Sequence, residues 1–223
     1  MKISEIFLSI EGEGIRTGAP AVFIRLFGCN LRCSYCDSMY AVEGSDFTEM
    51  SPEEVFLKVK SFNTQYVTLT GGEPLIHKDV EVLLKMLDDY GLEVNIETNG
   101  TQPKPSGYRH ILCTMDWKSI SSGMQPKMNL ANMMTLRGKD VLKFVVGTEE
   151  DLQDAARVIG AMETEYAREG WKLPTFYVSP IFGTMKYEDM VNWILSNATM
   201  RRNNVRFQVQ LHKVIWDPEA RGV

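Results

Sequence analysis

The sequence predicts an α/β fold, an open, partial β/α barrel with parallel strands. Runs rich in β-branched and aromatic residues recur along the 223 residues, with helical patterns between them. This alternation is typical of βαβ units, whose strands form a parallel sheet. Because a closed barrel needs eight such units and the chain offers six or seven strands, we expect an open barrel. No linker-like run interrupts the pattern, so residues 1–223 are predicted to form one domain.

The elements follow from local signals. Strands are predicted over residues 21–27, 66–70, 93–98, 111–117, 141–147, 175–179 and 205–211. Ser51 and Pro52 mark a helix start, because a Ser N-cap is followed by Pro at the first helical position and a capping-box acid. Gly91 marks a helix end, since Gly is the usual residue after a C-cap. Helices are predicted over residues 52–61, 79–90, 149–168 and 187–196.

Composition limits the function classes. Hydrophobic residues make up 44% and charged residues 24% of the chain, and no apolar run reaches the ~20 residues of a membrane span. The net charge of −5 argues against nucleic acid as the main partner. The first residues carry no secretion signal, and three of four Cys are clustered rather than spread as a disulfide framework. We expect a cytoplasmic protein with a small substrate and no membrane or nucleic-acid partner.

Polar motifs stand where the predicted strands end. In parallel α/β sheets ligands bind at the carboxyl ends of the strands, so these motifs mark the expected site. They are Cys29 after the first strand, Thr70-Gly71-Gly72-Glu73 after the second, Glu97 to Asn99 after the third, Asp116 to Lys118 after the fourth and Ser179-Pro180 after the sixth.

Cys29, Cys33 and Cys36 give the spacing C-x-x-x-C-x-x-C. Iron–sulfur clusters are held by Cys thiolates, normally four. Three thiolates without a nearby fourth Cys therefore predict a 4Fe-4S cluster with one open iron that a small molecule completes. A zinc site would need four ligands in paired spacing, which is absent, although Cys113 or one of the three His residues stays open as a distant fourth ligand.

The Cys spacing, with Tyr35 just before the third Cys, resembles the signature of the radical S-adenosylmethionine superfamily. The resemblance implies that this cofactor completes the cluster and yields a 5′-deoxyadenosyl radical. It also implies that Gly72 and Glu73 meet the methionyl amino group, and that Glu97 and Asn99 approach the nucleoside. The full set of cofactor residues that it implies is Tyr35, Cys36, Asp37, Gly72, Glu73, Glu97, Asn99, Asp116, Trp117, Lys118, Ser179, Pro180, Ile181 and Phe182.

Further motifs spread over nearly the whole chain resemble the 7-carboxy-7-deazaguanine synthase family. They are Ser9-Ile-Glu-Gly-Glu-Gly14, Phe23-Ile-Arg-Leu26, Cys36-Asp-Ser38, Asp116-Trp-Lys-Ser-Ile-Ser-Ser-Gly-Met124, Tyr177-Val-Ser-Pro-Ile-Phe-Gly183 and Gln210-Leu-His-Lys-Val-Ile-Trp216 with Arg221-Gly-Val223. The implied reaction is a radical ring contraction of 6-carboxy-5,6,7,8-tetrahydropterin with loss of ammonia. The product is the deazapurine core of queuosine and related compounds. No side chain beyond the cluster and the cofactor radical is implied as catalytic.

The resemblance also implies substrate contacts. They are Ile10, Glu11, Gly12, Arg25, Thr70 and His212, and Glu13 is added as a second carboxylate that could accept from the pterin. The chemistry agrees, because a carboxylate accepts from the guanidine-like edge of a pterin and an Arg fork binds its carboxylate. One residue departs from the family, which usually has Gln at the position of Glu11. A buried carboxylate there would need a donor.

Ser38 is implied as a ligand of Mg²⁺, which takes few protein oxygens when substrate oxygens complete its shell. The family more often has Thr at this position. Cys113 lies within a predicted strand and is expected to be a small buried hydrophobe.

Two alternatives stay open. A glycyl-radical-enzyme activating enzyme shares the Cys spacing and the small barrel, but it would not carry the Ser9 to Gly14 or Cys36 to Ser38 motifs. An iron–sulfur electron carrier or a zinc-binding module would leave the strand-end loops without a purpose. The family resemblance further implies a homodimer and an electron donor such as flavodoxin or ferredoxin.

Overall fold

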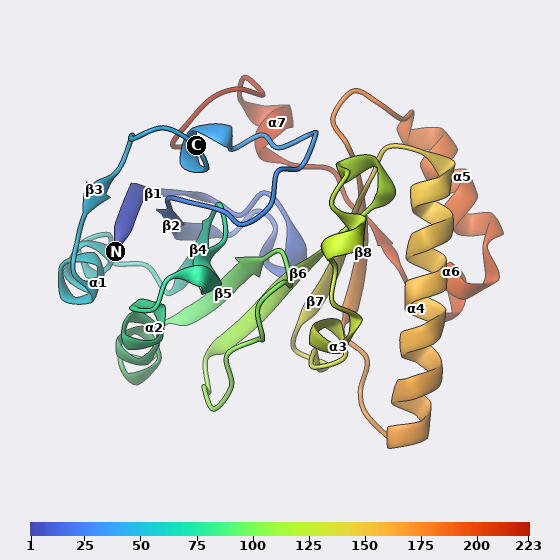
Figure 1. The fold of residues 1–223 in the computed structure, drawn as a ribbon, viewed down its shortest axis with the longest axis horizontal. Coiled ribbons are helices and arrows are strands. Elements are labelled where there is room, and N and C mark those ends of the chain that lie inside the picture. Colours follow the sequence, from blue (N-terminus) through green and yellow to red (C-terminus); the bar gives the residue numbers. More distant parts are fainter.

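The computed structural model describes residues 1–223, and its strands form one open nine-stranded sheet (Figure 1). In sheet order the strands are β3 (Thr48–Glu49), β1 (Lys2–Ile10), β2 (Pro20–Leu26), β4 (Tyr66–Gly71), β5 (Glu93–Thr98), β6 (Ile111–Lys118), β7 (Val141–Val146), β8 (Thr175–Pro180) and β9 (Arg206–Phe207). From β2 to β9 all neighbours are parallel, whereas β1 pairs antiparallel with both β2 and β3. The predicted open, parallel barrel is confirmed, with an antiparallel edge that was not predicted.

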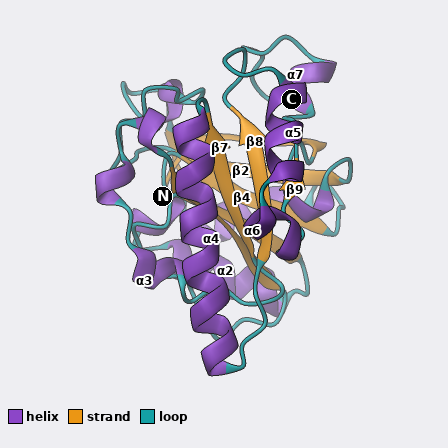
Figure 2. Ribbon diagram, turned by 90° about the vertical axis from the view of Figure 1, so that its right-hand side faces the viewer, coloured by secondary structure: helices purple, strands orange, loops and turns teal.

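Helices cover the outer face of this sheet, and α4 lies in front of it in Figure 2. They are α1 (Pro52–Lys60), α2 (Val80–Asp89), α3 (Leu130–Met133), α4 (Glu149–Glu169), α5 (Tyr187–Ser196), α6 (Ala198–Arg202) and α7 (His212–Ile215). Ser51 closes the predicted capping box with Glu54, and Gly91 follows α2 with a φ of 85°. The four predicted helices are therefore confirmed. The short helices α3, α6 and α7 were not predicted.

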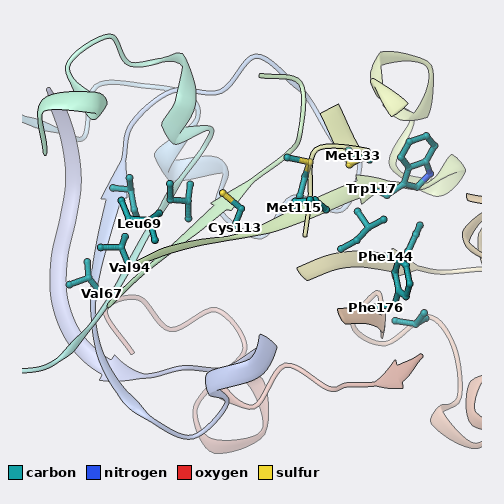
Figure 3. Close-up of a cluster of buried hydrophobic side chains, with 14 of the residues drawn as sticks. Val67, Leu69, Val94, Cys113, Met115, Trp117, Met133, Phe144 and Phe176 are labelled. Atoms are coloured by element: carbon teal, nitrogen blue, oxygen red, sulfur yellow. The ribbon is translucent and has the colours of Figure 1, made fainter. Parts of the chain in front are cut away.

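The core lies between the sheet and these helices. Alternate residues of a strand point to opposite faces, and the outward row of β4 to β8 is apolar. Figure 3 shows part of this cluster, in which Val67, Leu69, Val94, Cys113, Met115, Trp117, Phe144 and Phe176 come from successive strands. Cys113 is buried among them, as expected of a small hydrophobe. The opposite row of side chains faces the inside of the barrel.

The strand predicted over residues 205–211 is wrong in length, because β9 holds only Arg206 and Phe207. Gln208 N still donates to Val178 O on β8 at 3.0 Å, but the Gln208 side chain bonds to the loop after β1. It accepts a hydrogen bond from Gly14 N and donates one to Thr17 Oγ1, so the chain turns toward the loop after β1. Residues further along form α7 instead of continuing the sheet. No helix is long and apolar enough to span a membrane.

Phe144→Ala tests the packing of the core. Phe144 is fully buried on β7, and truncating a buried Phe leaves a cavity, so we expect a loss of about 3–5 kcal/mol in the free energy of unfolding. Urea unfolding of the cluster-free protein measures it. Leu57→Ala on α1 is the control, because Leu57 is 63% exposed and should change stability by only about 0.5 kcal/mol. Equal effects of the two substitutions would contradict this description of the core.

Candidate functional site

The loop after β2 brings the three clustered thiols to one cavity. Cys29, Cys33 and Cys36 are free, partly buried, and line a cavity of about 770 Å³ at the carboxyl ends of the strands. Leu31 N donates to Cys29 Sγ at 3.4 Å, and Asn99 Nδ2 lies 3.8 Å from the same sulfur. Three free thiols on one loop, with N–H donors nearby, are a donor set that fits a cluster.

Two glycines let this loop approach the end of β4. A Cβ at Gly71 would lie 2.2 Å from Leu26 O, and one at Gly72 would lie 2.3 Å from Gly28 O and 2.7 Å from Cys29 Cβ. Any larger residue would push the Cys loop away. Gly72 also lines the cavity, as the resemblance implied for a residue near the cofactor.

Glu73 lies behind the cavity wall and does not line it. Its fully buried carboxylate accepts from Leu75 N, Thr98 Oγ1 and Asn99 N at 2.6–2.9 Å. Because these donors already occupy both of its oxygens, the side chain positions the turn after β5. This role differs from the expected contact with the methionyl amino group.

The three predicted residues at the end of β6 lie on two different faces of the sheet. Asp116 and Lys118 line the cavity and form an ion pair at 2.8 Å. Trp117 between them points outward into the core, where its Nε1 donates to Asp154 Oδ2 on α4 at 2.7 Å. Strand alternation thus turns the Trp117 side chain away from the cavity, and the contact of this residue with the cofactor stays a prediction.

The predicted residues at and after the end of β8 also differ in whether they line the cavity. Ile181 and Phe182 line the cavity, whereas Ser179 and Pro180 do not. Both Ser179 and Pro180 are buried at the end of the strand, and the Ser179 hydroxyl has no hydrogen-bond partner. Only the second half of this predicted segment therefore lines the cavity.

All the predicted substrate residues line the same cavity. They are Ile10, Glu11, Gly12, Glu13, Arg25, Thr70 and His212. Tyr35, Asp37, Ser38, Glu97 and Asn99 also line it. The topology thus brings together the loop after β1, the Cys loop, the ends of β4 to β6 and the C-terminal segment.

Glu11 does have the donors that its burial demands. Arg16 donates to Glu11 Oε1 at 3.1 Å, and Thr68 Oγ1 donates to the same oxygen. Arg16 is itself buried and also donates to Glu93 O and Val67 O at the start of the strands. Burial raises the pKa of Glu11, while Thr68 and Arg16 act in the opposite direction.

Arg25 is held by a residue that the sequence analysis missed. Glu5 lies opposite it in the antiparallel pair of β1 and β2, and Glu5 Oε1 accepts from Arg25 Nε at 2.6 Å and from Tyr40 Oη at 2.8 Å. No hydrogen bond within the protein engages the two terminal nitrogens of Arg25. Glu5 thereby orients a guanidinium fork that lines the cavity.

Asp37 joins the Cys loop to α7. Ser38 Oγ donates to Asp37 Oδ1 at 3.0 Å, and Lys213 Nζ lies 3.0 Å from Asp37 Oδ2. Burial alone would raise the pKa of Asp37, but the Lys213 ammonium lowers it to about 2. His212 beside Lys213 packs on Gly12, where a Cβ would lie 2.4 Å from its Nδ1. Burial lowers the pKa of His212.

Lys143 is the most central residue that the sequence analysis missed. It stands in the middle of β7, its Nζ contacts Glu13 Oε2 at 2.5 Å and Asp116 Oδ1 at 3.3 Å, and it lines the cavity. A signal for it was present, because a single Lys interrupts the apolar run of β7. Such a residue in a buried strand needs a charged partner.

Glu97 is a partly buried carboxylate that forms no ion pair and accepts a single hydrogen bond. Thr70 Oγ1 donates to its Oε2 at 3.2 Å. Burial, together with the carboxylates of Glu13, Glu11 and Asp116, raises the pKa of Glu97 to about 7, against the effect of Lys143.

Glu97→Gln should make stability less dependent on pH. The pKa of Glu97 rises from 4.5 to about 7 on folding, so the folded state binds more protons in this window and the parent loses stability as the pH rises through it. Gln carries no charge and lacks this loss. Thermal melting of the cluster-free protein should therefore favour the variant over the parent more at pH 8 than at pH 5.

The exposed, unpaired Glu49 gives the control for this experiment. Glu49→Gln should shift the melting temperature by the same small amount at both pH values. If Glu97→Gln behaved in the same way, the carboxylate would not be titrating in this window.

Comparison with known proteins agrees with this geometry. A model of the radical SAM superfamily matches residues 23–114, which hold the Cys loop, β4 and β5. A 7-carboxy-7-deazaguanine synthase from Clostridium acetobutylicum is 40% identical, over 100% of this chain and 99% of its own. One from Methanospirillum hungatei is 42% identical, over 98% of this chain and 86% of its own.

The fold is also found in a solved structure. A crystal structure of QueE from Escherichia coli matches with a TM-score of 0.73 and 23% identity, over 94% of this chain and 93% of that one. The match of the two curated relatives over almost the whole chain favours this family over the activating enzymes and electron carriers considered above. The chain belongs to the 7-carboxy-7-deazaguanine synthase family, within the radical SAM superfamily.

Proposed function

We propose that this protein converts 6-carboxy-5,6,7,8-tetrahydropterin to 7-carboxy-7-deazaguanine with loss of ammonia. The observation that carries the proposal is one cavity that combines three free thiols with buried carboxylates and an oriented Arg fork. The identity to named synthases over the whole chain supports the same reaction. The product belongs to the synthesis of queuosine and other 7-deazapurines.

Cys29, Cys33 and Cys36 would hold the 4Fe-4S cluster. When bound, the reduced cluster and S-adenosylmethionine supply a 5′-deoxyadenosyl radical that takes hydrogen from the substrate. We assign the cofactor end of the cavity to the predicted cofactor residues that line it. They are Tyr35, Cys36, Asp37, Gly72, Glu97, Asn99, Asp116, Lys118, Ile181 and Phe182.

The substrate would lie against the loop after β1. Arg25 is suited to the substrate carboxylate, because Glu5 holds its Nε and leaves the fork free. Glu11 is suited to the N–H edge of the pterin, since Arg16 and Thr68 fix one of its oxygens. Thr70, Glu13 and His212 line the same region.

Ser38 and Asp37 offer the oxygen ligands that Mg²⁺ prefers, and both line the cavity beside the Cys loop. We propose that Ser38 holds the ion against the substrate carboxylate. Asp37 is engaged by Lys213 and is less available.

We further propose a cytoplasmic homodimer that receives electrons from a flavodoxin or a ferredoxin. Free thiols that must bind a cluster require a reducing compartment. The single sheet that runs from β3 to β9 supports treating residues 1–223 as one domain.

Anaerobic reconstitution followed by incubation with S-adenosylmethionine, dithionite and the tetrahydropterin tests the function. We expect 5′-deoxyadenosine and 7-carboxy-7-deazaguanine from the parent and from Cys113→Ala, whose thiol is in the core. Cys33→Ala should lose the cluster and form neither. Iron content and mass spectrometry measure the outcome. 5′-Deoxyadenosine without deazaguanine from the parent would reject this substrate, and a full cluster in Cys33→Ala would reject the ligand assignment.

Ser38→Ala tests the proposed metal ligand. Removing its hydroxyl should raise the Mg²⁺ concentration needed for half-maximal product formation, while Ser38→Thr keeps the hydroxyl and should match the parent. Product assays over a Mg²⁺ series measure both. An unchanged response of Ser38→Ala, with iron content equal to that of the parent, would place the ion elsewhere.

A further inference from the structure

Lys143 is a buried cation at the centre of the barrel. Its side chain is 8% exposed and projects from β7 on the cavity face, next to Asp116 in the register of β6 and β7. Burial acts against its charge, but Asp116, Glu13 and Glu97 together raise the pKa of Lys143 well above its ordinary value. The side chain is therefore an ammonium throughout the working pH range.

This ammonium forms ion pairs with the loop after β1 and with β6. Glu13 belongs to the loop after β1, at the end of the cavity assigned above to the substrate. Asp116 belongs to β6, at the end assigned to the cofactor, and Lys118 holds its other oxygen at 2.8 Å. Lys143 is the only residue that forms ion pairs with both Glu13 and Asp116.

The two carboxylates depend on this contact. Glu13 Oε1 is buried without a hydrogen-bond partner, and Asp116 Oδ1 has no contact of this kind other than the Lys143 ammonium at 3.3 Å. Without the ammonium, Glu13 would have no ion-pair partner and Asp116 would keep only Lys118. Glu13 would move or take up a proton, because a buried charge that loses its partner is strongly unfavourable, and Asp116 would lose one of its two cations.

We propose that Lys143 is a positioning residue that sets the spacing between the substrate and cofactor ends of the cavity by holding Glu13 and Asp116 on one ammonium. This inference rests on the proposed function. Transfer of hydrogen between two bound molecules depends steeply on their separation and orientation. A small shift of either end would therefore leave cofactor cleavage possible while hydrogen transfer from the substrate fails.

Lys143→Met keeps the length of the side chain without its charge and is the main test. In the reconstituted enzyme we expect the ratio of 5′-deoxyadenosine to 7-carboxy-7-deazaguanine to rise by about tenfold or more, because misplacement uncouples cleavage from conversion. Lys143→Arg keeps the charge and should give an intermediate ratio.

A second measurement needs no cluster. Pterin-6-carboxylate is fluorescent, so its anisotropy reports binding to the cluster-free protein. We expect Lys143→Met to weaken this binding by about tenfold, since Glu13 loses its fixed position. The double variant Lys143→Met/Glu13→Gln lacks the unpaired carboxylate and should therefore fold even if the single variant does not. Its ratio of 5′-deoxyadenosine to 7-carboxy-7-deazaguanine should still be high.

Lys104→Met is the matched control. Lys104 also pairs a poorly exposed ammonium with a buried carboxylate, that of Asp140, but it does not line the cavity. Lys104→Met should lower the melting temperature about as much as Lys143→Met does. It should leave the product ratio and the binding of pterin-6-carboxylate unchanged.

The possible outcomes separate this proposal from the function on which it rests. A parent that forms no deazaguanine rejects the proposed function. A parent that does form it, together with Lys143 variants whose ratio and analogue binding match those of Lys104→Met, leaves Lys143 a purely structural role and overturns the inference. Equal loss of 5′-deoxyadenosine and product at an unchanged ratio has the same meaning.

Discussion

The alternation of side chains along β4 to β8 is the constraint on which both the core and the cavity depend. Each of these strands presents one row of side chains to the helices and the other row to the inside of the barrel. On β6, Trp117 packs in the core while Asp116 and Lys118 line the cavity. A slip of one residue would place these charges under α4 and the indole among the proposed ligands, so the register that stabilises the fold also builds the site.

The charges of the inner face are arranged in pairs and chains, since burying an isolated charge is costly. The pairs are Glu11 with Arg16, Glu5 with Arg25, and the run of Glu13, Lys143, Asp116 and Lys118. Glu97 lies among them without an ion pair of its own, and its burial, together with the neighbouring carboxylates, raises its pKa. Burial of the apolar outer face stabilises the fold. The polar groups of the inner face contribute less to stability but are positioned to bind ligands.

Sequence signals were sufficient where the chemistry is local. The Cys spacing, the capped helices and the strand-end motifs all depend on residues close together in the chain. The structure brings the Cys loop and most residues of the strand-end motifs to one cavity. The contact of Glu5 with Arg25 depends on an antiparallel strand outside the βαβ pattern, so periodicity did not reveal it. Trp117 and Lys143 were within reach of the alternation rule, which places one outside and the other inside, whereas the role of Glu73 required its three donors to be seen.

Glu11 shows how a departure from a family pattern is accommodated by another residue. A Gln at this position would carry its own N–H donors and no charge, and Arg16 would then lie buried beside Tyr66 without an anion. With Glu11 the guanidinium has a carboxylate partner, and its remaining hydrogen bonds go to strand carbonyls at the start of β4 and β5. The pair therefore closes the floor of the barrel and fixes one oxygen of Glu11. Residues 11 and 16 form one unit in which changing either residue alone leaves the other as a buried charge without its ion-pair partner.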